Sequence, residues 1–96
     1  MKIAFDLDGT VIRNATHDNN YLDGEVIPEM LELVNMLYDE GHEIYFFTCR
    51  DQFFQMQTDQ WLRERGLKFH YMYMSKPFYH IFILQRKKEA YVHILP

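Results

Sequence analysis

The chain has 96 residues, of which 48% are hydrophobic and 25% charged, and its formal net charge is −4. This composition predicts one folded domain, residues 1–96, and excludes an intrinsically disordered chain. No apolar run approaches the roughly 20 residues of a membrane span. The single cysteine, Cys49, cannot form an internal disulfide. We therefore expect a cytoplasmic protein with neither a signal peptide nor a membrane partner.

Charge is divided unevenly along the chain. Residues 1–60 carry 12 acidic and 3 basic side chains (−9), whereas residues 61–96 carry 2 acidic and 7 basic ones (+5). The acidic bulk argues against general affinity for nucleic acid. The basic C-terminal third either faces a phosphate group or balances the acidic half. Balance is favoured because the run Arg86–Lys88 is short and has no interleaved aromatic residues.

The most specific pattern lies in the first ten residues. The short, mostly apolar run Lys2–Phe5 predicts a buried strand, and Asp6, Asp8 and a Gly9-Thr10 turn follow it. Residues i and i+2 of an extended chain point to the same side, so both carboxylates are expected to face one cleft at the strand end. Such a pair suits a hard cation or a nucleophile with an acid. An ordinary Asp-rich turn also fits this pattern.

A polar stretch follows, and the chain then alternates between helices and strands. Residues 13–25 predict a loop or hairpin within a flap of about residues 11–26, long enough to be functional. His17, Asp18 and Asp23 can reach a substrate or metal from there, although solvated loop residues fit the pattern more often. Pro28 opens a helix that Gly41 ends. Its apolar stripe predicts core positions at Met30, Leu31, Val34, Leu37 and Tyr38.

The second half of the chain predicts further strands and one helix. A strand at residues 44–47 completes a βαβ unit, which implies a parallel pair with a right-handed crossover. Asp51 is the predicted N-cap of the next helix, which Gly66 ends. The buried face of this helix is predicted to consist of Phe54, Thr58, Trp61 and Leu62. Strands are predicted at residues 67–74 and 79–84, and a last apolar run covers residues 90–95.

The string Ile3-Ala4-Phe5-Asp6-Leu7-Asp8-Gly9-Thr10-Val11 resembles the first motif of the haloacid dehalogenase (HAD) superfamily of phosphohydrolases. Thr48 and Lys76 match its second and third motifs in order and spacing. The resemblance implies a three-layer, Rossmann-like α/β fold with a parallel sheet, a central first strand and no cap domain. Thr48-x-Arg50, Trp61-Leu62 and Lys76-Pro77 are similar to the small capless members, namely capsule-biosynthesis phosphatases and the phosphatase halves of polynucleotide kinases.

The resemblance also implies roles for individual residues. Asp6 matches the nucleophile that forms an aspartyl-phosphate, and Asp8 matches the general acid/base. Thr48 matches the hydroxyl donor to the phosphoryl oxygens, and Lys76 matches the cation that orients the nucleophile. Mg²⁺ is expected on the Asp6 carboxylate and the Asp8 backbone carbonyl. The expected substrate contacts are Gly9, Thr10, Cys49 and Arg50, with Cys49 acting as a small spacer and not as a nucleophile.

One family feature is missing from the sequence. The fourth motif supplies an acidic pair as further Mg²⁺ ligands, but Leu84 and Gln85 stand at those positions, and the tail 84–96 diverges from the pattern. Even an outer partner of a metal ligand is worth about 10- to 100-fold in affinity or activity. We therefore expect weak activity that needs high Mg²⁺. A carbonyl of Gln85 or a carboxylate such as Glu89 remains an open replacement.

The predicted function is Mg²⁺-dependent hydrolysis of a phosphomonoester on a small molecule such as a sugar phosphate or a nucleotide. Two alternatives stay open. The first is a catalytically impaired HAD-like domain that binds phosphate or a partner, because the fourth-motif acids are absent. The second, less favoured, is a nucleic-acid 3′-phosphatase, which requires the basic tail to face the cleft.

Overall fold

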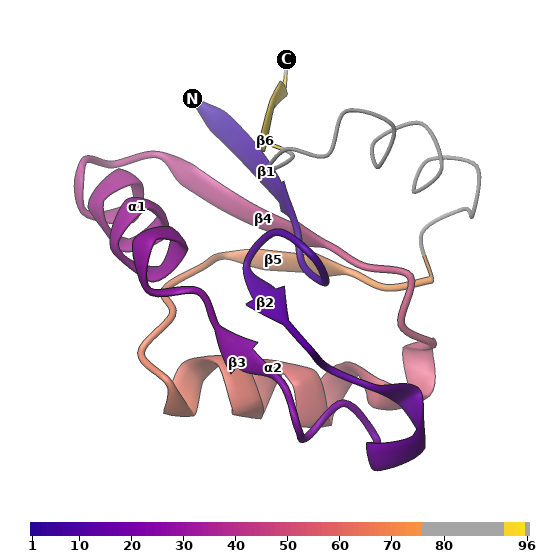
Figure 1. Ribbon diagram of the computed structural model, residues 1–96. Coiled ribbons are helices and arrows are strands. Elements are labelled where there is room, and N and C mark those ends of the chain that lie inside the picture. The colour runs from indigo at the N-terminus through magenta and orange to yellow at the C-terminus, as the bar shows by residue number, and fades with distance from the viewer. Residues whose placement is uncertain (76–91, 96) are drawn as a thin grey trace.

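The computed structural model describes residues 1–75 and 92–95. The predicted strand 79–84, Lys76, Leu84, Gln85 and Glu89 all lie outside these ranges. Neither described helix has the length and apolar character needed to cross a membrane. The described elements (Figure 1) are β1 (Lys2–Asp6), β2 (Ile12–Arg13), β3 (Glu25–Val26), α1 (Pro28–Asp39), β4 (Glu43–Phe47), α2 (Gln55–Glu64), β5 (Tyr71–Tyr73) and β6 (Val92–Leu95), with 3₁₀ turns at His17–Asn19 and Gln52–Phe54.

The main sheet has the strand order β5-β4-β1-β6. β1 runs parallel to β4, and β4 runs parallel to β5. The prediction of a parallel sheet with the first strand inside it is therefore confirmed for these three strands. β6 pairs antiparallel with β1, with Lys2 opposite Leu95, so the sheet also has one antiparallel strand. The sequence indicated only an apolar run at residues 90–95, so neither this strand nor its direction was predicted.

Helix α1 forms where the sequence predicts it. Pro28 occupies the first turn, where its missing N–H costs nothing. Gly41 follows the helix with φ +94°, a conformation that favours glycine. Met30 and Val34 are buried, and the rest of the predicted stripe is half-buried against the core. The amphipathic pattern therefore identified the inward face of α1 correctly.

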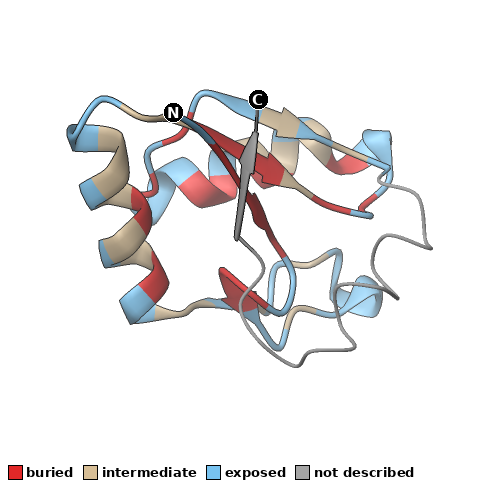
Figure 2. Ribbon diagram, turned by 90° about the horizontal axis from the view of Figure 1, so that it is seen from above, coloured by how far each residue is buried: buried red, intermediate tan, exposed pale blue. Residues whose placement is uncertain are grey.

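Both described helices pack on the same face of the sheet. Phe5 of β1 and Phe46 of β4 are in register, with ring centroids 6.3 Å apart. They belong to one buried cluster with Val34 of α1 and Leu62 of α2, which Figure 2 shows as the red centre of the molecule. Burying each such side chain contributes about 1.5–3 kcal/mol. The predicted α/β class is confirmed, whereas no described helix covers the opposite face, where a third layer would lie.

β5 is shorter than the predicted strand 67–74. Phe69 is buried, but Tyr71 and Tyr73 are 51% and 55% exposed, and regular pairing begins only at Tyr71. The imidazole of His70 explains the late start. Its Nδ1 accepts a hydrogen bond from the Ile44 backbone N–H at 3.0 Å, while its own backbone N–H donates to the Ile44 carbonyl at 2.9 Å. A side chain therefore takes the place of a strand partner at this position.

Replacing His70 with alanine is expected to lower the free energy of unfolding by about 1–3 kcal/mol, because the N–H of the buried Ile44 loses its acceptor. Urea denaturation measures this loss. His42→Ala is the matched control, since within residues 1–75 and 92–95 the polar contacts of the His42 ring are with the exposed Met1 amino group and the Glu40 carboxylate. It is expected to change stability by about 0.5 kcal/mol or less. Equal losses in the two variants would contradict the assigned role of His70.

Candidate active site

Residues that follow β1, β4 and β5 meet at the carboxyl edge of the sheet. Asp6 is the last residue of β1 and lies in register with Phe47, the last residue of β4. The backbone N–H of Thr48 donates to the carbonyl of Tyr73, the last residue of β5, at 2.9 Å. Open parallel sheets bind their ligands at this edge. Asp6 and Thr48 therefore stand at the ends of adjacent strands, where a site is expected.

The loop after β1 turns back tightly on itself. The carbonyl of Leu7 accepts hydrogen bonds from the N–H groups of Val11 and Ile12 at 2.9 and 3.0 Å. Gly9 has φ +89°, and an added Cβ would meet nothing within 4 Å, so the backbone conformation and not space requires glycine here. Thr10 is buried. The turn keeps the side chain of Asp8 close to the strand end.

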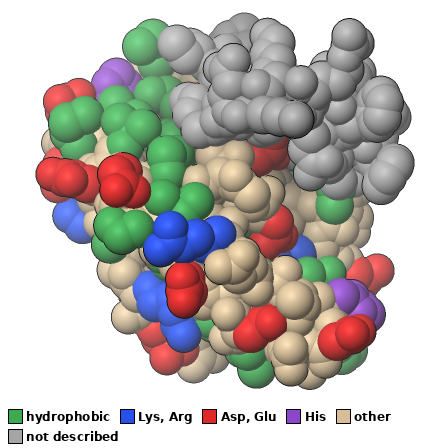
Figure 3. Space-filling model, in the orientation of Figure 1, with side chains coloured by type: hydrophobic (Ala, Val, Ile, Leu, Met, Phe, Trp, Pro, Cys, Tyr) green, Lys and Arg blue, Asp and Glu red, His purple; other side chains and the backbone are tan. Residues whose placement is uncertain are grey.

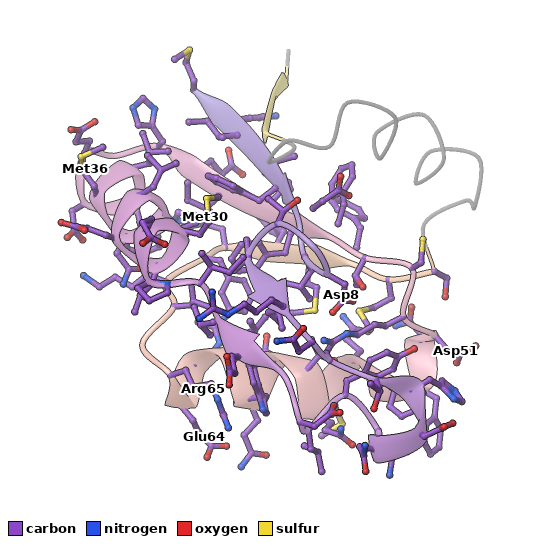
Figure 4. All side chains as sticks on the ribbon, viewed as in Figure 1. Asp8, Met30, Met36, Asp51, Glu64 and Arg65 are labelled. Carbon is purple, nitrogen blue, oxygen red and sulfur yellow. The ribbon has the colours of Figure 1, made fainter. Side chains whose placement is uncertain are left out.

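The Asp8 carboxylate is held by a guanidinium on both of its oxygens. Arg50 donates from Nε to Oδ2 at 3.0 Å and from Nη2 to Oδ1 at 2.7 Å. The Arg50 side chain is only 2% exposed, whereas that of Asp8 is 39% exposed. The Thr48 hydroxyl adds a longer hydrogen bond of 3.4 Å to Oδ2. Figure 4 shows Asp8 between the end of β1 and the chain leading into α2. The hydrogen bond from Thr48 shows that Asp8 and Thr48 do come together.

The remaining contacts of Arg50 tie it to other parts of the domain. Its Nη1 donates to the hydroxyl of Thr58 in α2 at 3.2 Å. Its Cζ lies 4.3 Å from the centroid of the Tyr21 ring. Its backbone N–H donates to Thr48 Oγ1 at 3.1 Å. Substrate binding by Arg50 stays a prediction, whereas the contacts shown for its guanidinium are with Asp8, Thr58 and Tyr21.

Asp6 and Cys49 differ in exposure beside this ion pair. Asp6 is a buried residue, with 7% of its surface exposed. Cys49, in contrast, is exposed to solvent. Partial burial raises the pKa of the Cys49 thiol, and the negative charge of Asp8 raises it further. Cys49 therefore favours the neutral thiol, which is a poor nucleophile compared with a thiolate.

The described oxygen donors suit a sparse magnesium site. No group of three or more His, Cys, Asp or Glu side chains that could hold a metal occurs in residues 1–75 and 92–95. Mg²⁺ commonly uses one or two carboxylates together with waters and phosphate oxygens. The Asp6 carboxylate and the Asp8 backbone carbonyl fit that pattern, while the Asp8 carboxylate is engaged with Arg50.

Lys76 cannot be placed, because it lies outside the described residues. Ser75 is the last described residue before it, and its backbone N–H donates to the Arg50 carbonyl at 2.8 Å. The chain therefore reaches the same edge of the sheet one residue before Lys76. The convergence of the Lys76 side chain with Asp6 remains a prediction.

The predicted flap is a small hairpin formed by β2 and β3. Asp23 accepts hydrogen bonds from the backbone N–H and the hydroxyl of Thr16, at 2.8 and 2.7 Å. These bonds lower the pKa of Asp23 and tie the two sides of the loop together. The His17 ring contacts the edges of Tyr21 and Phe54, and Asp18 is exposed. Asp23 thus has a structural role that its sequence context did not reveal.

Two residues near Asp8 were not predicted to belong to the site, namely Tyr21 and Thr58. Thr58 was predicted as a core position of α2, and it is indeed buried, but its hydroxyl also holds Arg50. Tyr21 is the only Phe, Tyr or Trp within residues 13–25. An isolated aromatic residue in a polar stretch is the one signal that points to a packing role there.

A comparison with protein families matches residues 3–95 to the family described as "PITM 1-3, LNS2 domain". No curated protein and no solved structure gives a significant match. The match supports the HAD-like superfamily, but it does not show the finer resemblance to capsule-biosynthesis phosphatases or polynucleotide kinases. Because it spans nearly the whole sequence, the chain belongs to the LNS2 (Lipin/Ned1/Smp2) domain family of the HAD-like superfamily.

Proposed function

We propose that the domain hydrolyses phosphomonoesters with Mg²⁺ and forms an aspartyl-phosphate on Asp6. Family membership supports a phosphatase at the coarse level. The observation that carries the finer proposal is the position of the Asp8 carboxylate. It lies at the carboxyl edge of the sheet two residues after Asp6, fixed by Arg50 and within 3.4 Å of the Thr48 hydroxyl. A nucleophile and an oriented acid/base are the minimum that this chemistry requires.

The residues divide the reaction into two balanced steps. A carboxylate oxygen of Asp6 attacks the phosphorus, the bond to the leaving oxygen breaks, and that oxygen takes a proton from the protonated Asp8 carboxyl and departs as an alcohol. Water then attacks the phosphoryl group, gives one proton to Asp8, and releases inorganic phosphate and the free Asp6 carboxylate. Bound Mg²⁺ supplies positive charge against the phosphate oxygens.

The Arg50 contacts suit the second step better than the first. A carboxylate whose two oxygens accept hydrogen bonds from Arg50 is held in the orientation of a base. To give a proton to the leaving oxygen, Asp8 must carry that proton on a carboxylate oxygen that now accepts a hydrogen bond from Arg50 or Thr48. We therefore expect formation of the aspartyl-phosphate to limit the rate with an alkyl ester, whose leaving oxygen needs this proton. An aryl phosphate has a leaving group that departs without it, so its aspartyl-phosphate is expected to accumulate.

Acid quenching during turnover of an aryl phosphate tests the proposed function. We expect a phosphoryl group on the peptide that contains Asp6, found by mass spectrometry, and release of inorganic phosphate that depends on Mg²⁺. Half-saturation should require a high Mg²⁺ concentration, because Leu84 and Gln85 replace the acidic pair. Turnover with phosphate attached to Cys49, or turnover that is independent of Mg²⁺, would contradict the proposal.

A second candidate function is binding of phosphate or of a phosphorylated partner without hydrolysis. Both carboxylate oxygens of Asp8 accept hydrogen bonds from Arg50. A carboxylate held in this way is a poor proton donor, which favours binding without hydrolysis. Inorganic phosphate that shifts the amide NMR signals of Gly9 and Thr48 without any turnover would select this candidate. The 3′-phosphatase alternative has no comparable support. Acidic and basic side chains are interspersed on the face of the molecule seen in Figure 3.

A further inference from the structure

Tyr21 has a backbone conformation that is unusual for a bulky residue. Its φ is +63°, and the preceding Asn20 has φ +54°. Non-glycine residues rarely adopt this left-handed region, and asparagine tolerates it better than tyrosine. Such a conformation persists only where the surroundings determine it, and it is a reason to ask what the side chain does.

Contacts from both the hairpin and α2 hold Tyr21 in place. Its N–H donates to the carbonyl of Thr16 at 2.9 Å, and the carbonyl of Asn20 accepts a hydrogen bond from the Gln57 side chain of α2. Its ring meets the Phe54 ring edge-on, with centroids 5.1 Å apart. The strained turn therefore places the ring between the hairpin and the start of α2.

The ring of Tyr21 covers one face of the Arg50 guanidinium, whereas the hydrogen bonds of the guanidinium lie along its edges. The N–H groups along two edges of the Arg50 guanidinium donate hydrogen bonds to Asp8 and Thr58, and these bonds fix the plane of the guanidinium. The Tyr21 ring lies over the face of that plane, with its centroid 4.3 Å from Arg50 Cζ. We propose that Tyr21 is a positioning residue, whose ring keeps Arg50 flat against Asp8 and so couples docking of the hairpin to the orientation of the Asp8 carboxylate.

The environment of the Tyr21 hydroxyl agrees with this placement. Burial raises its pKa, the Asp8 charge raises it further, and the Arg50 charge opposes both effects. The phenol therefore stays neutral, so the ring provides a π face for the cation without adding a second anion beside Asp8. The ring, and not the hydroxyl, is the part that the proposal requires.

The test compares Tyr21→Leu with Tyr21→Phe by the exchange of the Arg50 Nε–H proton with water, followed by ¹⁵N NMR. This proton is donated to Asp8, so its exchange reports directly on the ion pair. We expect exchange to become about 2- to 30-fold faster in Tyr21→Leu, which is the range of a lost cation–π contact. Tyr21→Phe keeps the ring and should remain near the parent rate. Tyr71→Leu on the exposed strand β5 is the matched control.

The catalytic consequence rests on the proposed function and is measured separately. With an aryl phosphate, Tyr21→Leu should lower kcat more than it changes KM, and Tyr21→Phe should restore kcat. Unchanged Arg50 Nε–H exchange in folded Tyr21→Leu would overturn the positioning role, whatever the activity. If no variant hydrolyses the ester, the proposed function fails while the exchange result still decides the role of Tyr21. Should Tyr21→Leu not fold, Tyr21→Met takes its place.

Discussion

Replacing Asp6 with asparagine is expected to abolish hydrolysis of an aryl phosphate, lowering kcat on the order of 10⁴-fold or more. The amide is close in size and shape to the carboxylate, so the 7% exposed side chain keeps its packing while it loses its nucleophilic oxygen. The phosphoryl group on the Asp6 peptide should disappear together with the activity. Steady-state kinetics and mass spectrometry of the acid-quenched protein measure the two effects.

Cys49→Ala is the matched control for this loss. Cys49 lies at the same edge of the sheet, but its thiol is favoured over the thiolate and the mechanism gives it no role. We expect kcat to stay close to that of the parent chain. If Cys49→Ala abolished hydrolysis while Asp6→Asn did not, the aspartyl-phosphate mechanism would be wrong.

The central elements of the fold were predictable because their patterns are strong and their ends are marked. β1 and β4 are apolar runs, α1 begins at Pro28 and ends before Gly41, and Asp51 accepts the Phe53 N–H at the 3₁₀ turn that leads into α2. The edges of the sheet were harder to predict. β5 is cut short because His70 substitutes its side chain for a strand partner, an interaction between residues 26 positions apart in the sequence.

The candidate site was likewise predictable only in part. The motif order was enough to predict that Asp8 and Thr48 approach each other, since consecutive parallel strands end at one edge. The partner of Asp8 was not predictable. Arg50 lies 42 residues after Asp8 in the sequence and two residues after Thr48. A cation at that position suggests a contact with phosphate. The Arg50 guanidinium contacts Asp8, Thr58 on α2 and the Tyr21 ring of the hairpin, and neither of the last two contacts has a local sequence signal.

A double-mutant cycle at Asp8 and Arg50 is expected to give a coupling free energy of about 1–3 kcal/mol. Each single change, Asp8→Ala or Arg50→Met, should lower the free energy of unfolding by about 2–4 kcal/mol. This is somewhat less than for a fully buried pair, because the Asp8 side chain is 39% exposed and water can reach it. The double variant should lose less than the sum, since neither charge is then left unpaired. Urea denaturation of the four chains measures the cycle.

The pair Arg13–Glu25 on the hairpin supplies the matched control cycle. Its Nε–Oε2 distance is 3.2 Å, close to the 3.0 Å of the Arg50 Nε–Asp8 contact, but its side chains are 53% and 63% exposed. Water and salt screen such a pair, so its coupling should be about 0–1 kcal/mol and should fall as salt is added. A coupling at Asp8 and Arg50 as small as that at Arg13 and Glu25 would mean that Arg50 does not hold the carboxylate. In that case the orientation of Asp8 would have to come from another part of the site, and the argument that the Asp8 carboxyl is a poor proton donor would fall with it.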